Sequence, residues 1–378
     1  MSSSLCNQTG PMGADRLESQ NPAGWNPGEY FFSSKADMSG TPELRQRMMN
    51  HLQEAQGLQL AYVGLVNGLF QALAAEPSSG EALAGRTATD PAYVARWCDA
   101  AYAFGMLDEN QGQFTLSSVG QAFLPDASFS LMPLAVNAML NSHMADRAAA
   151  LMRSGERPGE EVLAENKTLL PWFGPMLEGS FAPLFDQQIL NGVPVFSEMD
   201  RKGGLVVDLG CGNGWYLRQL ARKMANIKGV GLDGFAENIH QAADLAKKEK
   251  LDSRLRFLKG DIHDFTLDEP ADIIAMNRAL HHVWDKKESV FAALRDHLAP
   301  GGAVVIWEPN WPANRAELRH PAKRGLALQN LIEHIQGNHL LRPDEISAGF
   351  ESVGMIPQVY LFAEGREAVI VGRKKQTP

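Results

Sequence analysis

The clearest candidates for chemistry lie in the stretch from Gly203 to Asp233. Its first part, Leu205 to Leu209, is an apolar run interrupted only by Asp208, which predicts a strand buried on both faces of a parallel sheet. Glycines then occupy the alternate positions Gly210, Gly212 and Gly214. Because glycine has no Cβ, such a loop lets the backbone lie directly against a ligand. Open α/β sheets bind their ligands at this place, beyond the carboxyl ends of the strands.

The residues around the glycines restrict what that ligand can be. A dinucleotide site requires glycine at the sixth position of the loop, where this chain has Trp215. A phosphate-binding loop requires Gly-Lys followed by Ser or Thr, and this loop lacks that triplet. Asp208 would repel a phosphate but suits a cationic amino-acid end. Asp233 ends the next expected strand and can accept both hydroxyls of a ribose.

This motif, Asp-x-Gly-x-Gly-x-Gly, resembles the first motif of class I S-adenosylmethionine-dependent methyltransferases. The C-terminal half continues in the order of that family. The segment LKGDIHDF places Asp261 after a third strand, where the family reads the adenine amino group. A fourth strand is expected in ADIIAMNRALHHVWD and a fifth in LAPGGAVVIWEPN. The resemblance implies S-adenosylmethionine as cofactor and the following binding residues: Asp208, Gly210, Gly212, Asn213, Gly214, Asp233, Gly234, Asp261, Ile262 and Asn277.

The same resemblance implies an α/β fold. Residues 201–378 are expected to form a Rossmann-like methyltransferase domain with a seven-stranded sheet. The sheet should be mostly parallel, with the last hairpin strand antiparallel. The length of 378 residues favours at least two domains, so the N-terminal part needs a separate interpretation.

Residues 41–126 predict a mostly α-helical, winged-helix domain. Helix starts are indicated at Thr41-Pro42 and Asp90-Pro91, and a hairpin is expected around Gln111-Gly112. The helix from Pro91 to Gly105 holds one Arg and one Asp, which argues against DNA reading. This order of domains resembles small-molecule methyltransferases of the O-methylating type and their C-methylating relatives. In that group the N-terminal domain forms a dimer interface and roofs the substrate pocket.

Three other segments flank or join these domains. Residues 1–40 are rich in Ser, Asn, Gly and Pro and predict a flexible arm. Ala55 to Ala75 carries no charge, so a membrane helix is possible by length, but its polar residues favour a buried helix in a homodimer interface. Residues 127–200 are expected to be a helical connector and pocket lid. Helices are predicted at Ser130–Met152 and Leu163–Leu190, with prolines breaking the second.

Composition restricts the partners and the compartment. Hydrophobic residues make up 44% of the chain and charged residues 21%, which is typical of a globular protein with ample core. The net charge of −9 argues against nucleic acid or an anionic membrane as partner. Cys6, Cys98 and Cys211 have no metal-binding spacing and predict free thiols in a reducing compartment. The N-terminus lacks the pattern of a signal peptide, so a cytoplasmic location is expected.

Histidines are the candidate catalytic residues. Methyl transfer requires close placement of donor and nucleophile, and a base when the nucleophile is a hydroxyl, an enol or an acidic carbon. His281 and His282 follow the fourth strand, and His334 lies in the region after the fifth. His282 is favoured because it lies in the family motif, and Asp285 is close enough in sequence to orient one of the pair. Other candidates for the pocket are Glu308, as a facing acid, and Arg278, Arg315 and Arg319, as carboxylate binders.

A metal is an alternative to a base. Relatives that methylate the carbon beside the keto group of 2-oxo acids use two histidines, one from each of these regions, to hold an ion. His282 and His334 would fill similar places here, for a divalent or ferric ion. The function expected from the sequence is therefore methyl transfer from S-adenosylmethionine to a small molecule in specialised metabolism. The alternatives are metal-assisted C-methylation of a 2-oxo acid and, from a different class, a winged-helix DNA-binding regulator that senses S-adenosylmethionine.

Overall fold

The computed structural model describes residues 41–374 and divides the chain into two units, Met1–Glu54 and Ala55–Pro378. Of the first unit, the described part is the beginning of helix α2 (Pro42–Val66), capped by Thr41, whose hydroxyl accepts the Leu44 N–H at 3.2 Å. The predicted arm over residues 1–40, including Cys6, lies outside the described residues. All features below belong to the second unit.

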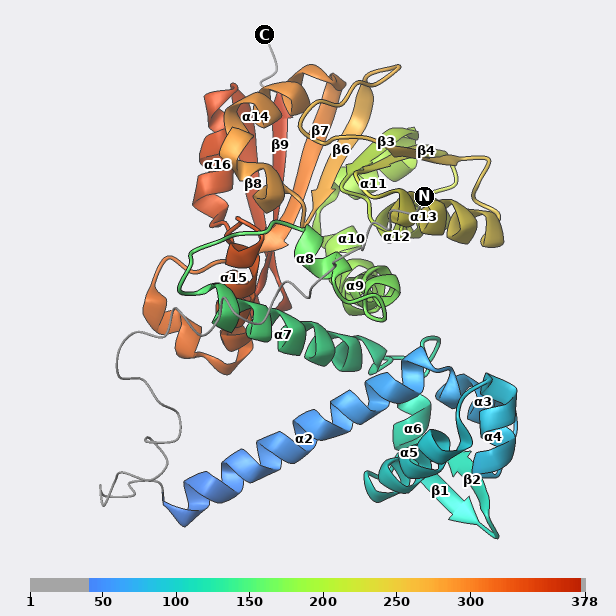
Figure 1. Ribbon diagram of the computed structural model, residues 1–378. Helices are drawn as coiled ribbons and strands as arrows, with labels where there is room; N and C mark the ends of the chain where they lie inside the picture. The colour runs from blue at the N-terminus through green and yellow to red at the C-terminus, as the bar shows by residue number, and fades with distance from the viewer. Residues whose placement is uncertain (1–40, 375–378) are drawn as a thin grey trace, which may run out of the picture. The chain divides into compact units, whose positions relative to one another are not determined.

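A seven-stranded sheet forms the centre of this unit, in the order β5-β4-β3-β6-β7-β9-β8 (Figure 1). Its strands are β3 (Gly204–Leu209), β4 (Ile227–Asp233), β5 (Leu255–Lys259), β6 (Ala271–Asn277), β7 (Leu298–Pro309), β8 (Met355–Phe362) and β9 (Glu367–Lys374). The pairs among β3 to β7 are parallel, and β9 is antiparallel to both β7 and β8. The predicted sheet, including its antiparallel hairpin strand, is confirmed.

Helices cover both faces of the sheet because its strands are apolar on both sides (Figure 1). Val206 packs with the helices before and after β3, whereas its neighbour Val207 packs with the later helices. The covering helices are α11 (Pro194–Lys202), α12 (Trp215–Lys223) and α13 (Ala236–Lys248) on the first side, and α14 (Lys287–Asp296) and α16 (Pro343–Ser352) on the second. Successive residues of β3 therefore point to opposite faces of the sheet and pack into two separate hydrophobic cores.

The winged-helix elements follow α2 in the predicted order. They are α3 (Leu69–Ala75), α4 (Gly80–Thr87), α5 (Pro91–Ala103), β1 (Leu107–Asn110), β2 (Gln113–Leu116) and α6 (Ser118–Ala122). Asp90 caps α5 by accepting the N–H groups of Ala92 and Tyr93, with Pro91 in the first turn. Gln111 and Gly112 connect β1 and β2 with φ of 52° and 76°, the conformation of a tight hairpin turn.

The uncharged stretch 55–75 differs from the prediction of one helix. It breaks at Gly68, with φ of 67°, between α2 and α3. Ala61, Leu65 and Phe70 are fully buried in the core of the winged-helix region, so much of this apolar surface is covered by the chain itself. Among residues 41–374 no single helix is long and apolar enough to cross a membrane; α2 and α3 meet that test only as a pair bent by 70°.

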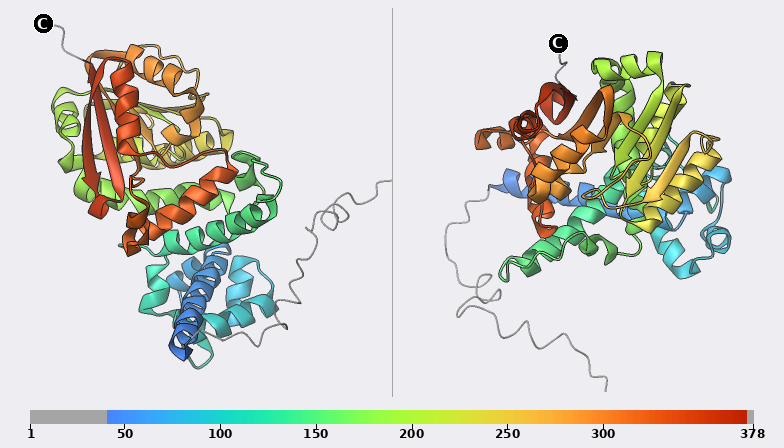
Figure 2. Two further views of the ribbon diagram at one scale, coloured as in Figure 1. Left: turned by 90° about the vertical axis from the view of Figure 1, so that its left-hand side faces the viewer. Right: turned by 90° about the horizontal axis from the view of Figure 1, so that it is seen from above.

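The connector is helical, but its prolines do not break it where expected. It contains α7 (Met132–Leu151), α8 (Glu161–Ala164), α9 (Leu170–Leu184), a π-helix (Phe185–Ile189) and α10 (Leu190–Gly192). Pro171 lies in the first turn of α9, where a missing N–H costs nothing. Pro175 and Pro183 lie inside α9, and the chain widens into the π-helix directly after it rather than ending. Helix α7 packs beside α15 (Arg324–Ile335), as Figure 2 also shows.

Candidate active site

One large cavity lies at the carboxyl ends of the parallel strands, with a volume of about 1490 Å³. Its floor is formed by the loops after β3, β4, β5 and β6, and its walls by α7, α9 and α15. Strand ends in a parallel sheet bring residues distant in sequence to a common edge, and this is where ligands bind in such folds. The cavity has two chemically different ends, one built around the glycine loop and one around the histidines.

At the first end, the loop after β3 presents bare backbone to the cavity. Gly212 has φ of 53°, and a Cβ built there would project into open space in the cavity. Its N–H donates to a carboxylate oxygen of Asp233 at 2.9 Å. The other oxygen of Asp233 accepts from Phe235 N and Asn238 Nδ2. Asp233 therefore lines the cavity as predicted and also fixes the shape of the glycine loop; its contact with a ribose stays a prediction.

Asp208 is a buried carboxyl group, and within residues 41–374 it forms no ion pair with a cationic side chain. Burial raises its pKa to about 8, helped by the nearby charge of Asp233 and opposed by a hydrogen bond from Asn277 Nδ2 at 2.9 Å. The Oδ1 atom of Asn277 is buried and has no hydrogen-bond partner among the described residues. Both groups line the cavity. Asp208 can take up a negative charge when a cation binds beside it, and the Oδ1 atom of Asn277 can accept a hydrogen bond from the same ligand. Together they suit a ligand with a cationic donor group, such as the amino-acid end of S-adenosylmethionine.

The other residues predicted to bind the cofactor divide into two groups. Gly210, Asn213, Gly234, Asp261 and Ile262 line the cavity. The carboxylate of Asp261 accepts the backbone N–H and the ring nitrogen of His263, and these bonds hold its pKa below the usual range. Gly214 does not line the cavity. With φ of 73°, its absent Cβ would lie 2.5 Å from the Phe257 ring, so Gly214 allows close packing beneath the loop, and its contact with the cofactor stays a prediction.

Asn213 has a partner that the sequence did not indicate. Its Nδ2 donates to Glu178 on α9 at 3.0 Å, and the same carboxylate pairs with the buried Arg218 of α12. Gly174 of α9 lies so close that a Cβ would be 2.9 Å from the Asn213 side chain. Helix α9 is thereby tied to the glycine loop and forms a wall over the first end of the cavity.

At the second end, His281 is held between two carboxylates. It lies in the 3₁₀ helix Leu280–Lys286 after β6 and is almost completely buried. Its Nδ1 is 2.8 Å from Glu308 on β7, and its Nε2 is 3.6 Å from Glu333 on α15. Burial lowers the pKa of His281, but the two carboxylates outweigh it and raise the pKa to about 10. His281 is therefore a fixed cation at neutral pH and is poorly suited to accept a proton.

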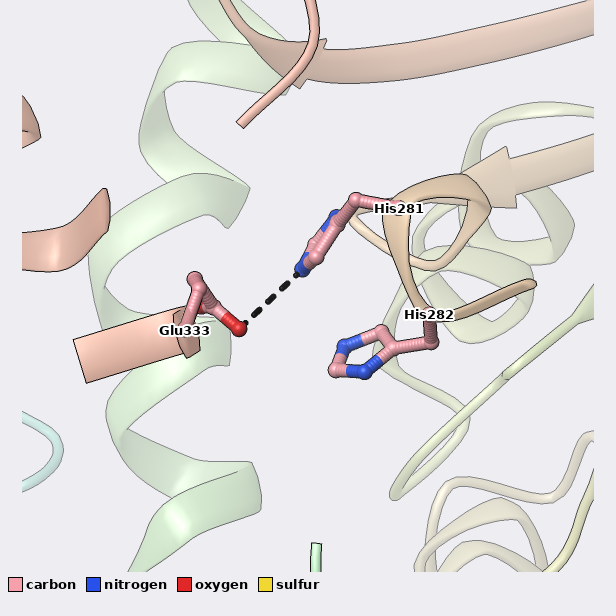
Figure 3. A group of neighbouring side chains, drawn as sticks. All are labelled: His281, His282 and Glu333. Atoms are coloured by element: carbon pink, nitrogen blue, oxygen red, sulfur yellow. Dashed lines mark ion pairs between the residues drawn. The ribbon is translucent and has the colours of Figure 1, made fainter. Parts of the chain in front are cut away.

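Glu308 and Glu333 complete this arrangement. Glu308, which the sequence suggested as an acid facing the pocket, is instead buried behind His281 and is not among the residues that line the cavity. Its second oxygen accepts the N–H of Leu280 at 2.9 Å. Burial raises the pKa of Glu333, but the bond to His281 dominates and lowers it to about 2. The pair His281 and Glu333 thus joins the end of β6 to α15 (Figure 3).

His282 is the more accessible ring of the two. It lines the cavity, and its ring centre is 4.2 Å from that of His281. Its Nδ1 is 2.8 Å from Glu160, which directly precedes α8, and 2.8 Å from the side-chain amide of Asn338. Glu160, not the predicted Asp285, is the acid at this ring. Nothing in the local sequence indicates Glu160, because it is 122 residues away along the chain.

His334 is not part of this cluster, which corrects the prediction. Among the α15 residues that line the cavity are Leu326, Gln329 and Glu333, which are spaced by three and four positions. One residue further along a helix turns the side chain by about 100°, so His334 is exposed on the outer side. The ligand atoms of His281, His282 and Glu333 lie within 4.8 Å of one another (Figure 3).

Of the three candidate arginines, only Arg278 lines the cavity; Arg315 and Arg319 are exposed elsewhere. Arg278 directly follows β6 and has a φ of 56°, a conformation that non-glycine residues seldom adopt. Its guanidinium lies 4.3 Å from the centre of the Phe181 ring and donates to Glu367 at 2.8 Å. Burial raises the pKa of Glu367 and the charge of Arg278 opposes that rise, so the arginine is partly neutralised by an internal partner.

Comparison with known proteins agrees with this geometry. Residues 206–302 match the family model described as a methyltransferase domain. They form a methyltransferase domain. The family predicted from the glycine loop is thereby confirmed. The match begins in β3 and ends in β7, so it contains the glycine loop, Asp233, Asp261 and the histidine pair.

Curated relatives that match this chain include proteins named trans-aconitate 2-methyltransferase. The chain is 31% identical over 147 residues to trans-aconitate 2-methyltransferase of Streptomyces avermitilis, covering 38% of this chain and 54% of that protein. It spans about half the length of the curated relatives it matches.

Solved structures extend the likeness to the N-terminal region. Human N-acetylserotonin methyltransferase in complex with SAM aligns with a TM-score of 0.67 and 17% identity, over 89% of this chain and 99% of that one. Mitomycin 7-O-methyltransferase aligns with a TM-score of 0.66 and 17% identity, over 88% and 98%. At this identity the likeness establishes the fold, which is the predicted methyltransferase sheet preceded by a helical region.

Proposed function

We propose that this protein transfers a methyl group from S-adenosylmethionine to a small-molecule acceptor. The observation that carries the proposal is that one continuous cavity joins the glycine loop and Asp208 to the cluster of His281, His282 and Glu333. Donor and acceptor can therefore lie side by side, which is the main requirement of an in-line methyl transfer. The relationship to mitomycin 7-O-methyltransferase supports an acceptor from specialised metabolism.

The first end of the cavity suits the donor. Asp208 and Asn277 would hold the cationic amino-acid end, and the bare backbone of Gly212 would allow close approach. Asp233 and Asp261 would bind the nucleoside part. When bound, S-adenosylmethionine supplies a methyl group activated by a positively charged sulfur. Helix α9, joined to Asn213 through Glu178, would cover a donor bound at this end and limit its contact with water.

The second end suits an acceptor that loses a proton. His281 and its two carboxylates form a rigid frame, since each ring nitrogen faces a carboxylate. His282 contacts its neighbours through Nδ1, which leaves Nε2 as the candidate acceptor of the proton. We therefore assign His282 as the general base, and His281, whose charge is neutralised by Glu308 and Glu333, as part of the fixed frame beside it.

A second candidate is metal-assisted C-methylation of a 2-oxo acid, and one specific observation favours it. Both His281 and His282 have their Nδ1 atoms on carboxylates, those of Glu308 and Glu160. Histidines that bind metals usually have such a partner, which leaves Nε2 as the ligand atom. With Glu333, and once an ion has displaced the Nε2 proton of His281, they would make a set of two histidines and one carboxylate with open positions, suited to a divalent or ferric ion. This set replaces the predicted pair of His282 and His334.

The test is turnover of S-adenosylmethionine to S-adenosylhomocysteine with a panel of phenols, enols and 2-oxo acids. It is run with and without a chelator, beside elemental analysis of the purified protein. His282→Ala should lower the rate roughly 10²–10⁴-fold, whereas His334→Ala, altering the exposed neighbour of Glu333 on the same helix, should not.

Loss of activity with chelator, together with loss of bound metal in Glu333→Ala, would favour the metal. Chelator-resistant activity favours the base. Absence of turnover with every acceptor, in protein that is folded and binds the donor, would contradict the choice of acceptor classes. Equal losses in His282→Ala and His334→Ala would contradict the assignment of the base.

A further inference from the structure

The segment 153–165, between α7 and α9, carries a charged residue to the second end of the cavity. Its Val162 is fully buried in an apolar cluster with Met144 of α7 and Ile332 of α15. The N–H of Gly159 lies 3.4 Å from the carbonyl oxygen of Ile335, at the end of α15. These two contacts seat the segment so that Glu160 reaches the imidazole of His282 at 2.8 Å.

Glu160 and Asn338 both contact Nδ1 of His282, but they require different protonation of that atom. The carboxylate of Glu160 can only accept, so a hydrogen bond at 2.8 Å requires a proton on Nδ1. The amide nitrogen of Asn338, also at 2.8 Å, can only donate, which requires Nδ1 to be bare. Both bonds cannot exist together. The oxygen and nitrogen of an asparagine amide can exchange places by rotation, so Asn338 can adapt to either proton position, whereas the carboxylate cannot.

We propose that Glu160 is a positioning residue that fixes His282 with its proton on Nδ1, which leaves Nε2 bare toward the acceptor. The amide of Asn338 is then turned so that its oxygen shares this proton. In a neutral imidazole one nitrogen donates and the other accepts, so the contact at Nδ1 decides what Nε2 can do. This inference rests on the proposed function only for its purpose, since the proton position is a property of the protein alone.

The arrangement also makes the base depend on the segment. The only regular structure in the segment is the short helix α8. Besides the two contacts described above, the segment is held to α7 by the ring of His143, 3.0 Å from the carbonyl oxygen of Val162, and by Arg147, 3.1 Å from the carboxylate of Glu165. When Glu160 is withdrawn from His282, the amide of Asn338 can donate to Nδ1, and the ring proton moves to Nε2. His282 then presents a donor where the proposed reaction requires an acceptor.

The experiment is nitrogen NMR of the full-length protein labelled with ¹⁵N-histidine, at a pH where the ring of His282 is neutral. The resonance is assigned by its loss in His282→Ala. In the unaltered protein we expect Nδ1 to carry the proton. Glu160→Ala should shift the proton to Nε2, and Asn338→Ala should leave it on Nδ1. Glu161→Gln, at the exposed next position, is the matched control and should change nothing.

A proton on Nε2 in the unaltered protein, or an unchanged ring in Glu160→Ala, would overturn the proposal. So would a shift in Asn338→Ala without one in Glu160→Ala, because Asn338 would then be in control. Where turnover has been established, Glu160→Ala should lower kcat roughly 10- to 100-fold with little change in KM. Failure of turnover in every variant concerns the proposed function, whereas the NMR result tests Glu160 independently of it.

Discussion

Binding of the donor should release a proton from Asp208. In the cofactor-free protein its carboxyl group is buried, forms no ion pair with a cationic side chain of residues 41–374 and has a pKa of about 8. A group with this pKa is about nine-tenths protonated at pH 7. If the ammonium group of S-adenosylmethionine binds beside it, the carboxylate becomes the favoured form, so about 0.9 proton leaves for each molecule bound at pH 7.

The affinity for S-adenosylmethionine should therefore rise with pH. Linkage predicts an increase of about ninefold between pH 6 and 7 and of about two- to threefold between pH 7 and 7.5. The assay is calorimetric titration in buffers of different ionisation enthalpy, because released protons add a heat proportional to that enthalpy. The amino group of the ligand itself titrates on the alkaline side, so measurements are restricted to pH 6 to 7.5.

Asp208→Asn is the control, since it keeps the shape and removes the titrating group. It should bind with a heat that does not depend on the buffer. Without ligand it should also lose part of the pH dependence of stability. The raised pKa means that the folded state binds more protons than the unfolded state between about pH 4 and 8, so stability falls as pH rises through this window. A buffer-independent heat in the unaltered protein would refute the reasoning.

Three further predictions concern the loop, the assembly and DNA. Gly212→Ala should weaken donor binding, because its Cβ would enter the cavity, and its φ of 53° should lower the melting temperature slightly. Gly214→Ala should lower the melting temperature more, because its φ of 73° is also left-handed and its Cβ would in addition meet Phe257 at 2.5 Å. Thermal unfolding and calorimetry of the two variants check this. We expect a homodimer through the winged-helix region, where Val63, Tyr93 and Tyr102 remain exposed, and a monomeric mass by light scattering at micromolar concentration would contradict it. Gel shifts with promoter DNA should show no salt-sensitive binding, since α5 carries only Arg96 as a cation; tight binding would restore the regulator alternative.

The part of the site that the sequence predicts is the part encoded by consecutive residues. The glycine loop and Asp208 form a local pattern, and each strand end follows from an apolar run, so their meeting at one sheet edge could be inferred. The π-helix after α9 and the break at Gly68 have weaker local signals, because a polar-apolar pattern does not reveal where a helix changes direction.

The partners of the histidines could not be predicted in the same way. Glu160 and Glu333 reach His282 and His281 from elements far along the chain. The residue type of His334 favours it as a base or metal ligand, but residue type does not show which way a helix faces. The orientation of α15 about its axis is set by the packing of residues such as Ile332 and Ile335 against α7. Because of this orientation, Glu333 and not the adjacent His334 points toward His281 and His282.

Calorimetric binding of S-adenosylmethionine to the unaltered protein, Asp233→Ala and His282→Ala tests the central claim most directly. The account predicts that the unaltered protein binds the donor and that His282→Ala binds it equally well, since His282 belongs to the acceptor end. Asp233→Ala should lose about 1.5–3 kcal/mol, or roughly a 10- to 150-fold increase in Kd, because a carboxylate that accepts ribose hydroxyls and shapes the glycine loop is removed. No binding by the unaltered protein, or unchanged affinity in folded Asp233→Ala, would contradict the account.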